Sequence, residues 1–325
     1  MVYLEAAVMY PYRKMEYYTD NFNEQNFIGN FQFGKFYRGV IKWMGNRKQP
    51  IVVKVWDTST PKNLKANQLR LMNELILFQH EKIPSHPGMV VKLYGFCSDG
   101  KHLAIIYEIK PLDTVYNLIP KANFTWLQRV KVAVGLARML RSLHSGRKPF
   151  DPFVVGNIDA AHVMVDEECN PRLLDFGMIC GGIFPKRQSF RIYGCDTDPC
   201  MDRKGELTEK TDVFAFGVVL LCLITKTVYV ENGKSDIPSV LYEWAWTKYK
   251  SYKSGGEDGK SDHLLVHQSL SAEPDYCSSD GCTIVNLGMK CIDNIQSERP
   301  TMKQVYKQLL KLEVVKHHAN FVGLE

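Results

Sequence analysis

Two pairs of cysteines are the first residues whose type and spacing could do chemistry. Four residues separate Cys195 from Cys200, and four separate Cys277 from Cys282. Thiolates at short spacing are common zinc ligands. No histidine lies at a matching distance from either pair, so we favour reduced thiols in loops and expect no metal site.

A second candidate is the stretch from Trp244 to Lys253, in which lysines alternate with tyrosines and tryptophans. This pattern could contact nucleic acid or a partner protein. A helix end that packs its rings on the core and keeps its lysines in water explains it equally, and we favour that interpretation. The net charge of +6, from 41 Lys and Arg against 35 Asp and Glu, is spread along the chain. Nucleic-acid binding is therefore not expected.

Composition bounds the class of protein and its location. The 325 residues, 45% of them hydrophobic and 23% charged, suffice for one large domain or two lobes. Nine cysteines, without a secretory segment in Met1–Lys14 or a run of about 18 apolar residues, predict a reducing compartment, namely the cytoplasm. Val2 excludes N-myristoylation, and no cysteine precedes Cys97 to carry a palmitoyl chain. We expect no direct membrane insertion, and recruitment to the plasma membrane only through partners.

The elements that must position functional side chains change type along the chain. Short apolar runs at Ile51–Trp56 and Leu103–Tyr107 predict strands, and apolar residues at helical spacing in Leu64–His80 predict a helix. Trp126–His144 is a second amphipathic helix, and Val213–Ile224 is apolar almost all round, which is typical of a buried helix.

These elements indicate an α+β fold, with a small β-rich N-terminal part that has one main helix and a larger, mainly helical C-terminal part. The stretch Lys248–Asp262, rich in Lys, Ser and Gly, shows no apolar period and is predicted to be a solvated loop.

Several motifs follow one another in a recognisable order. They are Tyr18–Phe22, IGNFQFGKFYRGV at Ile28–Val40, IVVKVW around Lys54, LMNELILF around Glu74, His86–Cys97, and Asp175-Phe176-Gly177. This order resembles the protein kinase superfamily, specifically plant receptor-like and receptor-like cytoplasmic kinases. The resemblance implies a bilobal kinase-like fold with an N-terminal extension (1–21), an N-lobe (22–109), a C-lobe (110–315) and a C-terminal tail (316–325).

The resemblance assigns nucleotide contacts to five residues of the N-lobe and to one residue of the C-lobe. The residues concerned are Ile28, Gly29, Gly34, Lys54, Glu74 and Asp175. In the family, backbone amides of the glycine-rich loop close over the phosphates of ATP, a strand lysine pairs with a helix glutamate, and the aspartate of Asp-Phe-Gly binds magnesium. For Lys54 and Glu74 a purely structural ion pair is the alternative.

Phe31 stands where the loop has its second glycine. A ring at this position would crowd an approaching phosphate, because glycine is what permits close backbone contact. ATP with magnesium is therefore left open, and no cofactor is expected to be required.

The resemblance places the largest departures in the catalytic loop. The family's His, Arg and catalytic Asp positions hold Val155, Gly156 and Asn157, its Lys position holds Asp159, and its metal-binding Asn position holds His162. An amide cannot accept the proton of a substrate hydroxyl, and Asp159 brings negative charge where the family has positive charge. We therefore expect a pseudokinase that is not an enzyme and has no catalytic residues.

Two further positions have structural roles in the family. Cys200 replaces the glutamate that pairs with a buried arginine, which is retained as Arg299. An unpaired buried guanidinium costs several kcal/mol, so we expect Arg299 to have another acceptor or to be solvated. Asp212 matches the helix aspartate that supports the catalytic loop, and we expect it to accept hydrogen bonds from backbone amides.

Among pseudokinases, the chain resembles the ZED-related kinases (ZRK). That resemblance implies an adaptor in plant innate immunity whose partners are a coiled-coil NLR immune receptor, other receptor-like cytoplasmic kinases and pathogen effectors. Lys186, Arg187 and Arg191, in the segment Gly177–Lys204, would then contact a negatively charged partner. A solvated basic loop is the alternative.

Two other functions remain open. One is a weakly active atypical Ser/Thr protein kinase that uses Asp159 or Asp175 in place of the missing base, although in-line transfer tolerates little misplacement. The other is a switch in which ATP binds without turnover and sets lobe closure.

Overall fold

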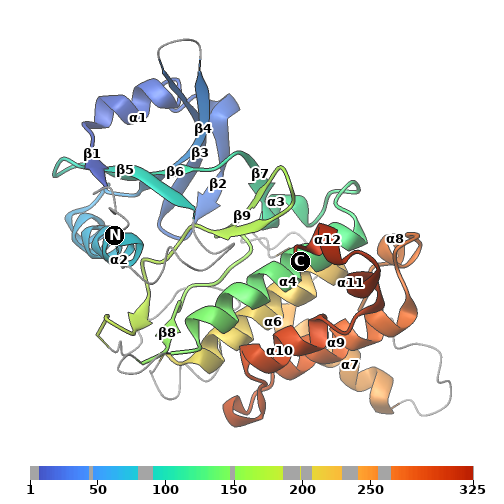
Figure 1. Cartoon of the computed structure of the whole chain (residues 1–325). Helices are drawn as coiled ribbons and strands as arrows, with labels where there is room; N and C mark the ends of the chain where they lie inside the picture. The colour runs from blue at the N-terminus through green and yellow to red at the C-terminus, as the bar shows by residue number, and fades with distance from the viewer. Residues whose placement is uncertain are drawn as a thin grey trace. The chain divides into compact units, whose positions relative to one another are not determined.

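The computed structural model describes residues 7–43, 47–79, 91–146, 151–185, 198, 207–228, 241–254 and 265–324. The chain forms two compact units, labelled by element in Figure 1. Unit 1 comprises Met1–Asn117 and Ala160–Ile179, and unit 2 comprises Leu118–Asp159 and Cys180–Glu325. Unit 1 is rich in strands and unit 2 is mainly helical, so the predicted α+β kinase-like fold class is confirmed. The predicted boundaries at residues 21, 109 and 315 stay a prediction.

Unit 1 is built on a six-stranded sheet in the order β1-β5-β6-β4-β3-β2. Its strands are β1 (Val8–Met9), β2 (Phe27–Phe31), β3 (Gly34–Lys42), β4 (Lys48–Trp56), β5 (Lys92–Ser98) and β6 (Leu103–Glu108). β1 pairs with β5 in parallel, and the other described pairs of this sheet are antiparallel. The strands predicted from apolar runs are confirmed as parts of β4 and β6.

The register of the sheet determines which side chains share a face. Lys54 of β4 lies opposite Ile105 of β6, and Val52 lies opposite Tyr107. Side chains two residues apart on a strand point to the same face, and directly paired residues share a face as well. Lys54 and Tyr107 therefore lie on the same side of the sheet.

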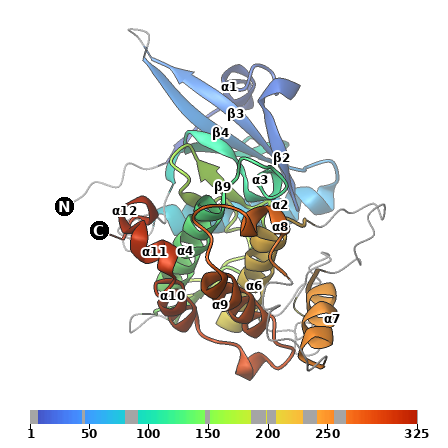
Figure 2. The same cartoon turned by 90° about the vertical axis from the view of Figure 1, so that its right-hand side faces the viewer.

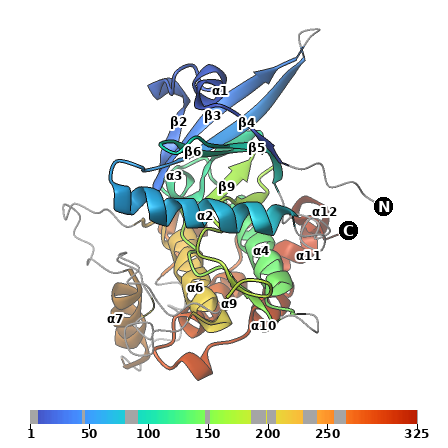
Figure 3. The same cartoon turned by 90° about the vertical axis from the view of Figure 1, so that its left-hand side faces the viewer.

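Helix α2 (Pro61–Gln79) contacts β6 and lies along unit 1, as Figure 3 shows. It confirms the predicted helix and begins three residues earlier, at Pro61, because proline is well tolerated in the first turn of a helix. Leu71, Leu75 and Phe78 are buried, and so is Glu74 between them. The helix therefore brings a carboxylate into the interior of unit 1.

The remaining elements of unit 1 are short. They are α1 (Tyr12–Tyr18), the 3-10 helix η1 (Glu24–Asn26), and a second sheet in the order β10-β9-β7, formed by β7 (Pro111–Thr114), β9 (Val163–Asp166) and β10 (Pro171–Leu173). The short helix α3 (Val115–Leu118) follows β7. Met15 of α1 is fully buried in a core cluster with Ile41, Ile51 and Ile106 of the large sheet.

Four helices form the centre of unit 2: α4 (Trp126–Leu143), α6 (Glu209–Thr225), α9 (Ser278–Cys291) and α10 (Met302–Leu309). α6 contacts both α4 and α9, and α10 also contacts both, which Figures 1 and 2 show from two sides. Contact on both sides explains why α6 is apolar all round, and the helices predicted at Trp126–His144 and Val213–Ile224 are confirmed. Thr125, Thr208 and Thr301 cap α4, α6 and α10 with reciprocal capping boxes.

The other described elements of unit 2 are two short strands and five further helices. β8 (Phe153–Val154) pairs with β11 (Cys180–Gly181), and the helices are α7 (Leu241–Ser254), α8 (Gln268–Ser271), η2 (Gln296–Glu298), α11 (Glu313–His317) and α12 (Ala319–Val322). In the described part of the chain, no helix combines the length and the apolar content needed to cross a bilayer.

The predicted solvated loop from Lys248 is wrong as far as Ser254, because α7 continues through these residues. Lysine is a good helix former, and the indole N–H of Trp246 donates to the Ile292 carbonyl oxygen at 3.3 Å. A helix end whose aromatic side chains contact the rest of unit 2 is thus the better description of the stretch that begins at Trp244. Residues 255–264 lie outside the described residues.

Candidate functional site

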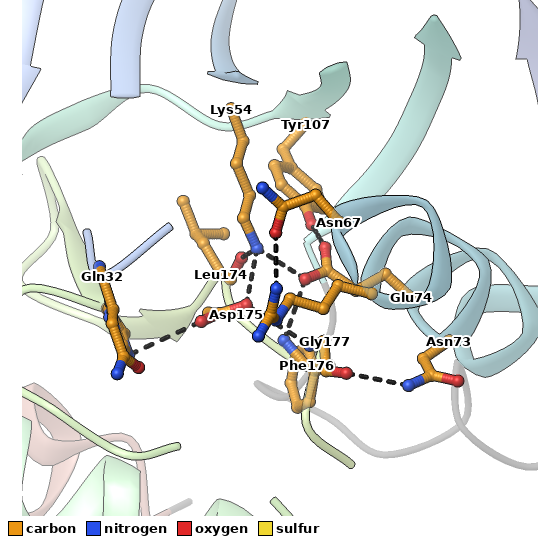
Figure 4. A network of polar contacts seen from close by, with 12 residues as sticks. Gln32, Lys54, Asn67, Asn73, Glu74, Tyr107, Leu174, Asp175, Phe176 and Gly177 are labelled. Atoms are coloured by element: carbon orange, nitrogen blue, oxygen red, sulfur yellow. Dashed lines mark hydrogen bonds and ion pairs between the residues drawn. The ribbon is translucent and has the colours of Figure 1, made fainter. Parts of the chain in front are cut away.

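Three buried ionisable side chains meet in unit 1. Lys54, Glu74 and Asp175 are each 0% exposed. Lys54 Nζ lies 2.5 Å from Glu74 Oε1 and 2.7 Å from Asp175 Oδ1, and it donates to the Leu174 carbonyl oxygen at 3.0 Å. Figure 4 shows these three contacts converging on the ammonium. Because an ammonium has three N–H donors, all of them are used within the chain.

The backbone after β10 is tied to α2, which keeps Asp175 beside Lys54. The Phe176 N–H donates to Glu74 Oε1 at 3.1 Å, and the Gly177 carbonyl oxygen accepts from Asn73 Nδ2 at 2.8 Å. The Phe176 ring meets Phe78 of α2 edge-on, with centroids 5.8 Å apart. The structure therefore brings together Lys54, Glu74 and Asp175, which come from a strand, a helix and a loop.

Tyr107 completes the cluster, and sequence reasoning missed it. Its hydroxyl donates to Glu74 Oε2. Burial raises the pKa of Glu74 to about 7, with Lys54 opposing the shift and Asp175 adding to it. Burial and the Glu74 carboxylate also raise the pKa of Tyr107 well above its ordinary value, so its proton stays available for the bond. The strand register, which places Tyr107 and Lys54 on one face, was the signal that could have identified it.

Asp175 is the ionised partner of the two carboxyl groups. Burial alone would raise its pKa, but the ammonium of Lys54 outweighs burial and holds the pKa of Asp175 well below its usual range. His162 Nδ1 lies 3.7 Å from Asp175 Oδ2, and the Gln32 N–H donates to His162 Nε2 at 3.4 Å. The His162 side chain therefore lies between Asp175 and the turn after β2.

These residues fit a magnesium ion only in part. An ionised carboxylate such as Asp175 is the hard oxygen ligand that Mg²⁺ prefers. His162, at the position of the family's second ligand, offers an imidazole nitrogen, which suits softer transition metals better. One of the two family positions therefore fits Mg²⁺ and the other does not.

Phe31 covers Lys54. Its ring is 5% exposed and packs on Phe36 with centroids 4.8 Å apart. Lys54 Nζ lies 4.7 Å from the Phe31 centroid and 4.5 Å from that of Trp56, distances at which a cation is attracted to a ring face. The edge of Phe31 also meets His162, with centroids 6.1 Å apart. A phosphate that approaches Lys54 from this side must therefore displace the Phe31 ring.

The other predicted loop residues lie in β2 and at the start of β3. The Ile28 carbonyl oxygen accepts from Asn117 Nδ2 at 2.6 Å. A Cβ atom added at Gly34 would lie 2.0 Å from the Val55 carbonyl oxygen, whereas one added at Gly29 would meet nothing closer than 3.7 Å. Close pairing of β3 with β4 therefore explains the glycine at position 34 without a ligand.

In unit 2, Asp212 in the first turn of α6 holds the loop that follows β8. It accepts hydrogen bonds from the Val155 and Gly156 N–H groups, each at 2.8 Å, and lies 2.9 Å from His144 Nε2. These are the backbone bonds expected for Asp212. Gly156 has a φ of 73°, in the region that disfavours residues with a Cβ atom.

The next loop residues carry the departures from the family. Asn157 is buried, with 8% of its surface exposed, and Asp159 is exposed. Residue 157 thus presents an amide in place of the family's base, while an exposed carboxylate lies two residues further on.

Arg299 has found another partner, as expected. It is 2% exposed, and its guanidinium binds both carboxylate oxygens of Asp198 at 2.5 and 2.7 Å. It also donates to the Asp293 and Lys210 carbonyl oxygens at 2.7 and 3.0 Å and lies over the Phe214 ring. Sequence reasoning did not identify Asp198, although an acidic residue two positions before Cys200 was a signal.

Some predicted residues cannot be placed. Lys186, Arg187, Arg191, Cys195 and Cys200 lie outside the described residues. Cys277 and Cys282 form no disulfide bond, and Cys282 lies in helix α9 and not in a loop as expected. Within the described residues no three His, Cys, Asp or Glu side chains form a group that could hold a metal ion.

Comparison with known proteins gives a consistent family. The model of the protein tyrosine and serine/threonine kinase family matches residues 22–309. The probable serine/threonine-protein kinase PBL6 of Arabidopsis thaliana is 28% identical over 95% of this chain and 70% of its own length. The serine/threonine-protein kinase PBS1 of the same plant is 32% identical over 74% of this chain and 52% of its own length. PBL21, also a probable serine/threonine-protein kinase of that plant, is 28% identical over 91% and 74%.

These relatives are named as serine/threonine-protein kinases, which contradicts the expectation that the chain is not an enzyme. The physical reason is that phosphoryl transfer depends mainly on positioning and electrostatic stabilisation, whereas a general base contributes a factor of roughly 10² to 10⁴. Asn157 by itself therefore argues for a slower reaction and not for the absence of one. With its homology to the receptor-like cytoplasmic kinases of Arabidopsis, this chain belongs to the protein tyrosine and serine/threonine kinase family.

Proposed function

We propose that this chain is a weakly active, atypical serine/threonine protein kinase that uses ATP with Mg²⁺. The observation that carries the proposal is the buried cluster of Lys54, Glu74 and Asp175, in which one lysine contacts both carboxylates. The names of the relatives supply the substrate class, a serine or threonine hydroxyl.

Each member of the cluster has a role in this proposal. Glu74 and Tyr107 hold the ammonium of Lys54 in place, and Lys54 binds phosphate oxygens. The bond from Lys54 to the Leu174 carbonyl oxygen is the one that a phosphate oxygen would replace, because it is the longest of the three and its acceptor is neutral. Asp175 would hold the Mg²⁺ ion, which when bound neutralises charge on the phosphate oxygens.

The missing base sets the expected rate. Kinases of this family turn over at about 1–100 s⁻¹, and loss of a general base costs a factor of roughly 10² to 10⁴. We therefore expect turnover on the order of 10⁻⁴ to 1 s⁻¹. The exposed carboxylate of Asp159 is our candidate to accept the hydroxyl proton.

A radiolabel transfer assay tests the proposal, with γ-labelled ATP, magnesium and a mixture of serine and threonine peptides. Wild-type protein should transfer label, and Lys54→Ala and Asp175→Ala should each abolish transfer. Lys101→Ala, a change of an exposed lysine in a turn, should transfer as the wild type does. A slower Asp159→Asn variant would support Asp159 as the proton acceptor, and an unchanged rate would remove it from that role.

Two results would overturn the proposal. The first is no transfer above background by the wild type. The second is a signal that persists in both Lys54→Ala and Asp175→Ala, because a contaminating kinase would then be its source. A thermal shift with ATP and magnesium but without transfer would favour the second candidate, a nucleotide-gated switch.

We further propose a partner-binding role in plant innate immunity, in the cytoplasm, with recruitment to the plasma membrane through partners. The partners would be a coiled-coil NLR immune receptor, other receptor-like cytoplasmic kinases and pathogen effectors. What favours this role is that Asp212 holds the loop backbone and Arg299 is paired with Asp198, while residues 156 and 157 differ in type from the family. Purification of the tagged chain from uninfected plant tissue should recover an NLR receptor, and its repeated absence would remove this role.

A further inference from the structure

Helix α2 of unit 1 carries three large apolar side chains on its exposed surface. Leu69, Met72 and Ile76 are 61%, 52% and 41% exposed. Their spacing of three and then four residues places them in one row along the helix. Figure 3 shows α2 on the near side of unit 1, with no other labelled helix or strand of that unit in front of it.

The row extends beyond these three residues. Before Leu69, the row continues through Lys65 (four residues earlier) and Lys62 (three residues before Lys65). After Ile76, it continues to Gln79, three residues later. The side chains of Lys62, Lys65 and Gln79 are exposed. Alternating steps of three and four are the heptad spacing by which one α-helix packs along another. We call the row from Lys62 to Gln79 the α2 seam.

The α2 seam is not the face by which the helix packs in its own unit. Leu71, Leu75 and Phe78 are buried on the other side of α2. An amphipathic surface helix needs one apolar stripe to pack on its core, whereas α2 has a second one in water. Clustered exposed apolar residues bordered by polar ones mark interaction sites more often than isolated ones do.

The charge around the α2 seam is positive. Glu74 is the single acidic residue of α2, and it is buried against Lys54. Lys62 and Lys65 are exposed at the N-terminal end of the seam. A partner that packs on the seam therefore meets positive charge at one end and apolar side chains in the middle.

We infer that the α2 seam is a docking surface for one amphipathic α-helix of another protein. That helix would carry apolar residues at heptad spacing and acidic residues at the end that meets Lys62 and Lys65. Apolar burial would supply affinity, and the opposite charges would fix the direction and register of the helix.

A second copy of this chain is a poorer occupant. Parallel pairing of two α2 seams would set the lysines against one another, which costs free energy because like charges repel. Antiparallel pairing would set Lys65 against Ile76 of the other copy, where neither side chain gains a complementary partner. An acidic helix from a different protein meets neither difficulty.

This inference does not depend on the proposed kinase activity. It does bear on unit 1, since α2 also carries Glu74 on its buried side, in contact with Lys54. A helix bound along the seam would restrict α2 and with it the position of the Glu74 carboxylate.

Fluorescence anisotropy with labelled synthetic peptides tests the inference on the full chain. The probe is a three-heptad helical peptide with leucine at both seam positions and glutamate at one end, made in two versions with the glutamates at either end to cover both directions. We expect one version to bind at micromolar concentration. Leu69→Asp combined with Met72→Asp should weaken it by about tenfold or more, and Ile295→Asp, at a 60% exposed apolar residue of unit 2, should leave it unchanged.

Charge reversal is the discriminating measurement. A peptide with lysine in place of glutamate should bind the wild type about tenfold more weakly, and Lys62→Glu with Lys65→Glu should reverse that preference. Absence of binding, equal binding of a scrambled peptide, or no reversal would overturn the inference. Self-association in sedimentation that Leu69→Asp abolishes would also overturn it, in favour of a second copy. If the double aspartate variant fails to fold by thermal unfolding, the milder Met72→Gln takes its place.

Discussion

Glu74 should make the free energy of unfolding fall as pH rises from about 4.5 to about 7, and Glu74→Gln should remove this pH dependence. Burial raises the pKa of Glu74 from 4.5 to about 7. Between these two values the folded chain holds a proton that the unfolded chain has lost, so the free energy of unfolding decreases as pH increases. The difference of about 2.5 units (7 − 4.5), at 1.36 kcal/mol per unit, corresponds to about 3 kcal/mol over the whole window.

Urea unfolding at pH 5.5 and pH 8 measures this contribution. From pKa values of 4.5 unfolded and about 7 folded, the wild type should lose about 2 kcal/mol more than Glu74→Gln between the two conditions. Other histidines and carboxyl groups titrate in both proteins, so the difference isolates residue 74. Parallel pH profiles would refute the reasoning and would mean that Glu74 is ionised and paired with Lys54 throughout.

Three further changes test the surroundings of the site. Asp198→Asn leaves the buried Arg299 guanidinium without a carboxylate and should lower the free energy of unfolding in urea by about 3–5 kcal/mol. The double change Asp198→Leu with Arg299→Met should restore most of that stability. A loss below about 1 kcal/mol for Asp198→Asn would contradict a stabilising ion pair. Gly156→Ala places a Cβ atom at a φ of 73° and should cost about 1–2 kcal/mol, and an unchanged midpoint of thermal unfolding would show that the loop relaxes. Phe31→Gly uncovers Lys54 and should tighten ATP binding about tenfold in calorimetry. Phe31→Leu should bind ATP as the wild type does. Equal ATP affinities of the wild type and both variants would argue against the Phe31 ring as an obstacle.

Much of the fold follows from local pattern. The apolar run at Ile51–Trp56 is a central strand because β4 has neighbours on both sides, and Val213–Ile224 is apolar all round because α6 is packed by two helices. Where the secondary structure of a segment depends on a contact with a distant residue, the local sequence pattern was insufficient to predict it. The stretch after Lys248 is helical, and the Trp246 contact with the Ile292 carbonyl oxygen has no signature in the local sequence.

The site divides in the same way. Motif order was sufficient to select Lys54, Glu74 and Asp175. Their residue types follow from the ion pairs that they form with one another. It could not reveal Tyr107 or Asp198, because each is chosen by a partner brought close through the fold. The expectation that the chain is not an enzyme failed for a different reason. A residue type at one position shows which single contribution to catalysis is missing, but the activation free energy combines contributions from many groups.

The bonds from Asp212 to the loop after β8 have a consequence for how this sequence can change. They reach backbone N–H groups, which every amino acid except proline possesses, so the path of the loop does not depend on the reactivity of its side chains. The backbone conformation of this loop can therefore persist while the side chains that would take part in a reaction are substituted. Substitution at position 156 is also biased toward one residue type. With φ at 73°, most residues with a Cβ atom would cost about 1–2 kcal/mol at position 156, so a change to glycine is favourable there and a change away from glycine is unfavourable.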